Sequence, residues 1–103
     1  METNIERFDA LTGLMVGTVG PYAFEAHVLP EGSTRGINGG RCASLCITDR
    51  NREPHANVVA YFNEFWTVEP QTYEVLEAFG AVLGLCDTAP PVVESPAPNS
   101  RKE

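Results

Sequence analysis

The chain has 103 residues, of which 43% are hydrophobic, so it has the length of one domain and can bury a core. Fourteen acidic and seven basic residues give a net charge of −7, which argues against direct binding to nucleic acid. No apolar run reaches the about 18 residues that a membrane helix needs, and three cysteines without an apolar leader segment favour reduced thiols in the cytoplasm.

The first half of the chain is typical of β structure. Thr3 and Glu6 have the spacing of a capping box, so a short N-terminal helix is compatible with the first residues. Two strands are expected next, Leu14–Val19 and Tyr22–Leu29, with a turn between them. In the second strand, the apolar residues alternate with polar ones and share one face: Tyr22, Phe24, Ala26 and Val28.

The second half adds two strands and one helix. Strands are expected at Cys42–Thr48 and His55–Phe62. From Pro70 on, apolar residues recur every three or four positions and predict a helix that ends near Gly84: Val75, Leu76, Phe79, Val82, Leu83 and Cys86. The predicted fold is α+β, with a four-stranded antiparallel sheet of two hairpins covered on one face by the C-terminal helix. Residues 1–87 form one domain, and the Pro/Ser-rich residues 88–103 are expected to be a disordered tail.

The glycine-rich stretch "STRGINGGRCASLCI" has the composition of a phosphate-binding loop but not its spacing. Neither the Walker pattern nor G-x-G-x-x-G occurs, and a strand rather than a helix follows. Asn38-Gly39 is a strong turn dipeptide, able to take positive φ at both positions. We therefore expect a structural turn, with an anion site at Arg35, Asn38 and Arg41 as the alternative.

The cysteines and histidines do not form a recognisable metal or catalytic motif. On one strand, Cys42 and Cys46 would lie about 13 Å apart, which is too far for a disulfide or for a shared zinc ion. Spacing alone does not exclude that a histidine, such as His27, meets Ser44 or a thiol in space. Since no catalytic motif appears, we expect no catalytic residues, no metal and no cofactor, and a protein that is not an enzyme.

A contact surface is expected where the last predicted strand joins the helix. The stretch Tyr61–Pro70 gathers aromatic and acidic residues, and residues 53–87 contain no lysine or arginine. Phe65 is expected to close the end of the core. For Trp66 both alternatives stay open, a place in the core and a place in the contact surface. The small residues Gly80 and Gly84 are expected to pack on the sheet. The proposed contact residues are Tyr61, Glu64, Trp66, Glu69, Glu74 and Glu77, and a solvated acidic surface is the plain alternative.

Two stretches, "GTVGPYAFEAHVLPEGSTRGINGGRCASLCITD" and "VVAYFNEFWTVEP", resemble a small uncharacterised domain of phage and Firmicute genomes. The resemblance rests on these residues: Gly17, Phe24, Ala26, Gly36 to Arg41, Trp66, Glu69 and Pro70. The chain departs from that pattern at Cys42 and Ser44. The resemblance implies a mobile-element origin and supplies no catalytic residue.

Charge and resemblance together favour a small acidic, non-enzymatic interaction protein, encoded by a phage or mobile element. We expect it to occlude the basic surface of a host protein that handles nucleic acid, as anti-CRISPR proteins do. It would act in the host cytoplasm as a monomer or homodimer, without binding nucleic acid or membrane itself. The alternative is a small-ligand or anion-binding module that uses the glycine-rich loop.

Overall fold

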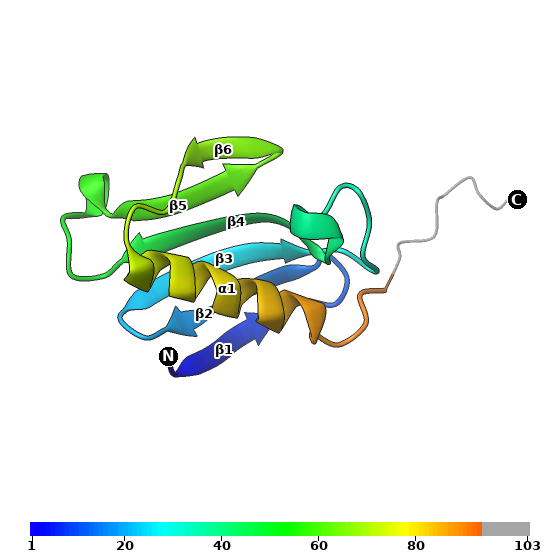
Figure 1. The fold of residues 1–103 in the computed structure, drawn as a ribbon. Helices are drawn as coiled ribbons and strands as arrows, with labels where there is room; N and C mark the ends of the chain where they lie inside the picture. The colour runs from blue at the N-terminus through cyan, green and yellow to red at the C-terminus, as the bar shows by residue number, and fades with distance from the viewer. Residues whose placement is uncertain (94–103) are drawn as a thin grey trace, which may run out of the picture.

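The computed structural model describes residues 1–93, which form a six-stranded antiparallel sheet with one helix on one face (Figure 1). Each strand pairs with the next strand along the chain, in the order β1-β2-β3-β4-β5-β6. The strands are β1 (Thr3–Phe8), β2 (Leu14–Val19), β3 (Tyr22–Val28), β4 (Cys42–Asp49), β5 (Val58–Asn63) and β6 (Phe65–Val68), and the helix is α1 (Tyr73–Asp87). The α+β class is confirmed, but the sheet has six strands rather than the predicted four.

The hydrophobic core lies between the sheet and α1. The predicted face of β3 is confirmed, since its four apolar residues are all at most 4% exposed: Tyr22, Phe24, Ala26 and Val28. On the helix, the buried residues are Val75, Ala78, Val82 and Cys86, which recur at helical spacing. One helix therefore covers one face of the sheet, and no other element of residues 1–93 covers the opposite face, which we call the open face (Figure 1).

The predicted N-terminal helix is wrong, because Thr3–Phe8 is the edge strand β1. Its pairing with β2 runs from Thr3 opposite Val19 to Phe8 opposite Met15. Close approach of the two strands depends on Gly17, where an added Cβ would lie 2.2 Å from the Asn4 carbonyl oxygen. Backbone pairing along the sheet edge thus outweighs the local capping-box signal.

The second additional strand, β6, has only four residues and follows β5 after a single connecting residue, Glu64. The predicted strand from His55 is shorter than expected: residues Pro54–Ala56 form the 3-10 turn η2, and β5 begins at Val58. The turn at Asn38-Gly39 is confirmed within η1 (Ile37–Gly39), with φ of 56° at Asn38 and 76° at Gly39.

The helix begins later than its sequence pattern predicts, and it ends just beyond Gly84, as expected. Thr72 caps its N-terminus, because the Thr72 hydroxyl accepts a 3.1 Å hydrogen bond from the Val75 amide. Gly84 lies inside the helix, which continues to Asp87. Gly80 and Gly84 are both exposed, and an added Cβ would meet no atom within 4 Å. The expectation that these glycines pack on the sheet is therefore wrong.

The described part of the expected tail, residues 88–93, lies against the domain. Ala89 is 8% exposed, and the Val93 amide donates a 2.8 Å hydrogen bond to the Ala10 carbonyl. Residues 94–103, the remainder of the predicted disordered tail, lie outside the described residues. Within residues 1–93, no helix combines the length and the apolar content that a membrane crossing requires.

Candidate functional site

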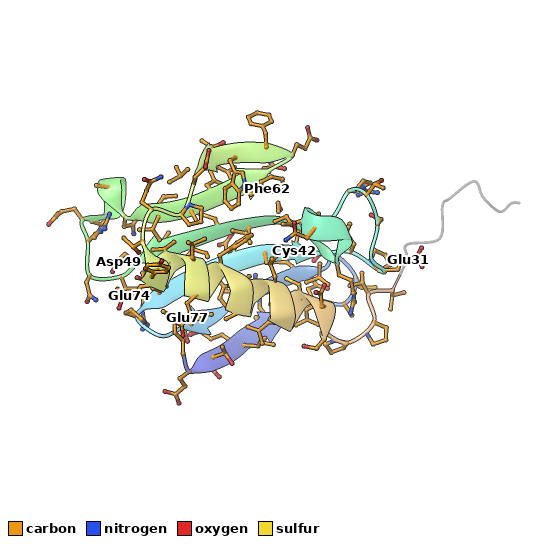
Figure 2. All side chains as sticks on the ribbon, viewed as in Figure 1. Glu31, Cys42, Asp49, Phe62, Glu74 and Glu77 are labelled. Atoms are coloured by element: carbon orange, nitrogen blue, oxygen red, sulfur yellow. The ribbon has the colours of Figure 1, made fainter. Side chains whose placement is uncertain are left out.

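The six predicted contact residues do not form one surface. Tyr61 lies opposite Cys46 on β4, on the open face of the sheet. Glu64 is at the tip of the β5–β6 hairpin. Figure 2 shows Glu74 and Glu77 on the other side of the molecule, along the first turns of α1. The structure therefore divides the predicted site between two faces and one end of the sheet.

Trp66 is mainly a packing residue at the margin of the core. Its indole makes edge-to-face contacts with Phe62, at 5.1 Å between ring centroids, and with Phe79 of α1, at 5.3 Å. The expectation for Phe65 is wrong, because its side chain is 69% exposed rather than part of the core. The alternation along β6 explains both positions, since neighbouring residues of a strand point to opposite faces.

The outer side of α1 exposes apolar side chains beside acidic ones. Tyr73 is 91% exposed and Leu76 is 49% exposed, and these two residues lie one helical turn apart. Together with the segment Pro70–Thr72 they line a shallow hollow of about 510 Å³. We call Tyr73, Leu76, Glu77 and Gly80 the outer helix face. It is part of the helix surface that the sheet does not cover, and Glu69 and Glu74 are exposed beside it.

Glu74 and Glu77, in the first turns of α1, have contacts within the chain. The Tyr22 hydroxyl donates a 3.4 Å hydrogen bond to Glu74 Oε1. Burial, the charges of Glu74 and Asp49, and this hydrogen bond raise the pKa of Tyr22 above its ordinary value. The Met1 amino group lies 3.3 Å from Glu77 Oε2 in an exposed ion pair. Such a pair contributes little to stability and leaves Glu77 accessible.

Arg41 has structural partners that its sequence position does not reveal. Its guanidinium donates to three carbonyls: Leu29 O at 3.0 Å, Ala89 O at 2.7 Å and Pro90 O at 3.0 Å. Its backbone amide donates to Asp87 Oδ1 at 3.0 Å. Arg41 thus ties the start of β4 to the segment after α1, and its donors already face carbonyl oxygens. Of the predicted anion-site residues Arg35, Asn38 and Arg41, only Arg35 belongs to the lining of the cavity described next.

Arg35 instead lines a cavity of about 510 Å³ at one end of the open sheet face. Its lining residues are His27, Thr34, Arg35, Gly36, Ala43, Ser44, Phe62, Asn63 and Glu64. The strand register places three of them in a row, because His27 is opposite Ser44 and Ser44 is opposite Asn63. We call this space the loop cavity. Arg35 and Glu64 belong to two different sites predicted from the sequence, and no local pattern links them.

The meeting of His27 and Ser44, which sequence spacing left open, occurs across β3 and β4, where the two residues lie opposite each other. Among residues 1–93, no hydrogen bond joins the two side chains. Nor do three potential metal ligands gather anywhere in this part of the chain. What the loop cavity offers is a set of polar groups suited to binding.

The thiols are separated by a β-bulge. A register shift between His27 and Val28 changes the alternation on β4, so Cys42 is buried at 1% exposure while Cys46 lies on the open face. A hydrogen bond with the Cys86 thiol, together with burial, raises the pKa of Cys42. Burial and the charge of Glu25 raise the pKa of Cys46. Figure 2 shows Cys42 beside α1, where Cys86 belongs to the buried helix face.

These features define a small α+β domain with an antiparallel six-stranded meander, one covering helix and two surfaces suited to contact. Residues 13–87 match a family model described as "Domain of unknown function (DUF7678)", and the chain belongs to this family. The match covers β2 to α1, which includes the loop cavity and the outer helix face. No curated protein and no solved structure matches the chain. The family description links the chain to neither a phage nor an anti-CRISPR domain, so those expectations stay predictions.

Proposed function

We propose that this protein is a non-catalytic binding protein whose outer helix face docks on a basic surface of a partner protein. The observation that carries the proposal is the exposure of Tyr73, at 91%, and Leu76, at 49%, next to acidic side chains. Large apolar side chains that lie exposed next to one another are typical of interaction sites. Tyrosine is also among the residues enriched at the energetic centre of interfaces.

The charge around these residues indicates the chemistry of the partner. Residues 53–87 contain no lysine or arginine, and Glu69, Glu74, Glu77 and Asp87 all belong to this stretch. A complementary partner presents lysines or arginines around an apolar hollow that accepts the Tyr73 ring. Of the predicted contact residues, Glu69, Glu74 and Glu77 fit this surface, whereas Tyr61 and Glu64 lie elsewhere.

In the finer form of the proposal, the partner is a host protein that handles nucleic acid, and docking blocks its basic surface. Support comes from the net charge of −7 and from the resemblance of the G-I-N-G-G-R loop to a phage-type domain. A protein of this kind acts in the cytoplasm of the host cell, as anti-CRISPR proteins do. It needs neither cofactor nor membrane, and the proposal holds for a monomer or a homodimer.

The test compares capture of partner proteins by the wild-type chain and by two variants. Tyr73→Ala removes the exposed aromatic of the outer helix face. Phe65→Ala removes an aromatic of similar exposure, 69%, from a different face and serves as the matched control. A specific partner should bind the control like wild type and bind Tyr73→Ala at least about tenfold more weakly, with affinity falling as salt is added.

Equal affinity of wild type and Tyr73→Ala for every captured partner would contradict the proposed surface. For the finer proposal, the captured partner is offered a nucleic acid in competition with this protein. Competition supports occlusion of a basic surface. Simultaneous binding of both contradicts the inhibitor role while leaving the docking surface intact.

A further inference from the structure

We propose that the loop cavity binds a small molecule that carries both a carboxylate and an ammonium group, as a free amino acid does. This site lies at the end of the open sheet face, so the inference is independent of the outer helix face. Figure 1 shows the β3–β4 loop and the turn between β5 and β6 at the same end of the sheet. The cavity between these elements has about 510 Å³, within the usual range for small-molecule sites.

Two opposite charges line the loop cavity without neutralising each other. Arg35 comes from the β3–β4 loop, and Glu64 comes from the β5–β6 turn. Within residues 1–93, the ion pairs are those of Met1 with Glu77 and of Arg52 with Asp49, so Arg35 and Glu64 are not paired. An arginine can hold a carboxylate through two parallel hydrogen bonds, and a glutamate can accept bonds from an ammonium group.

Glu64 adopts a backbone conformation that a glutamate does not favour. Its φ is 70°, and it alone connects β5 to β6. Glycine adopts this region without a steric penalty, whereas a residue that carries a Cβ is strained there. Asn38, the other non-glycine residue of the described chain with positive φ, belongs to a type that tolerates it. Glu64 therefore combines a strained backbone with a place in the lining of the cavity, and backbone strain of this kind is often found at binding sites.

Further polar groups lie between the two charges. His27, Ser44 and Asn63 form a row across β3, β4 and β5, and Thr34 comes from the loop. In the described part of the chain, none of these four side chains makes a hydrogen bond with another protein group. Their donors and acceptors are thus available to a ligand.

The charge pattern selects the chemical class. A simple anion would be attracted by Arg35 but repelled by Glu64. A simple cation would be attracted by Glu64 but repelled by Arg35. A molecule with both charges satisfies both residues, and its polar remainder can contact the row of His27, Ser44 and Asn63. The inference replaces the sequence-based anion site with a different residue set, of which only Arg35 is shared.

The test titrates the full chain with glycine, L-glutamate, L-lysine, 4-aminobutyrate and 6-aminohexanoate, with acetate and methylamine as single-charge controls. Binding is followed by amide chemical shifts in NMR spectra. At least one of the amino acids should saturate with shifts concentrated at the lining residues, at an affinity at least about tenfold above that of acetate or methylamine. Saturation by none of the five amino acids, or equal binding of acetate, would overturn the inference.

Variants then separate the charges from the fold. Arg35→Gln and Glu64→Gln should each weaken the best amino acid at least about tenfold. The matched controls Arg7→Gln and Glu31→Gln remove the same charges from exposed positions outside the cavity and should retain wild-type affinity. Glu64→Gly should unfold at a higher temperature than wild type, because the strain is relieved, and yet lose the ligand. Retained binding by Glu64→Gly would contradict the role of the carboxylate.

Discussion

Replacement of Arg41 tests whether this residue is a structural tie or an anion ligand. In Arg41→Met the side chain keeps its approximate length but loses all three hydrogen bonds to the carbonyls of Leu29, Ala89 and Pro90. Two of these bonds are partly buried and the third is exposed, so water can replace the third almost without loss.

The structure gives the expected size of the effect. A hydrogen bond from a charged donor is worth about 1.5–3 kcal/mol at most, and a partly exposed one about half of that. Two effective bonds therefore predict a loss of about 1.5–3 kcal/mol in the free energy of unfolding. For a chain of 103 residues this corresponds to a fall of roughly 7–14 °C in Tm.

Urea unfolding followed by tryptophan fluorescence measures this loss. The chain has one tryptophan, and Trp66 packs between Phe62 and Phe79, so its emission reports on the contact between β6 and α1. Arg35→Met is the control, because in the described chain the Arg35 side chain makes no hydrogen bond to protein and its loss should cost less than about 0.5 kcal/mol.

The result that would refute the structural role is a loss in Arg41→Met no larger than that in the Arg35 control. Inorganic phosphate provides a second comparison. An anion site at Arg41 would make phosphate stabilise the wild-type chain but not Arg41→Met. We expect phosphate to have the same effect on both, because the Arg41 guanidinium is already occupied by carbonyl oxygens.

Three further outcomes are expected. Gly80→Ala and Gly84→Ala should each raise the free energy of unfolding, measured in urea, by about 0.5–1 kcal/mol, because the added methyl group meets no atom and alanine has the higher helix propensity. A decrease in the free energy of unfolding would contradict the open surroundings of these two residues. In native protein, iodoacetamide should modify Cys46 well before Cys42, as mass spectrometry of digests will show, and equal rates would contradict the burial of Cys42. Cys86 and burial raise the pKa of the Cys42 thiol in the folded state, so the unfolded chain loses that proton first as pH rises. The free energy of unfolding should therefore fall as pH rises above the ordinary thiol pKa of 9.0. Its decrease between pH 8 and pH 10 should be smaller in Cys42→Ala.

The strand and the helix that short-range periodicity predicts most clearly are confirmed, although Leu76, predicted on the apolar helix face, is 49% exposed. The alternation from Tyr22 to Val28 predicted both a strand and its buried face. All apolar side chains of such a strand lie on one face, and only that face can pack against the core. The Asn38-Gly39 turn was equally predictable, because its positive φ angles are set by these two residue types. The apolar spacing after Pro70 predicted the helix, although Thr72 and not Pro70 defines its start.

The errors occur where local signals are weak or compete. β1 is an exposed edge strand, so it carries no hydrophobic alternation, and its capping-box residues suggested a helix instead. β6 is too short for a periodic pattern. On β4, the bulge opposite His27 shifts the alternation by one residue and sends Cys42 and Cys46 to different faces, whereas a regular strand would have kept them together.

The sequence by itself determined the fold class, the buried face of β3 and the acidic character of the chain, because these depend on residue type and on neighbours a few positions away. Only the tertiary structure decided which distant residues meet. Arg41 donates a hydrogen bond to Ala89, and Arg35 shares a cavity with Glu64. Both contacts depend on strand register and on the path of the loops, and no local sequence pattern encodes these. The exposure of Tyr73 is likewise a consequence of how α1 is rotated on the sheet, since the buried stripe of Val75, Ala78 and Val82 turns it outward.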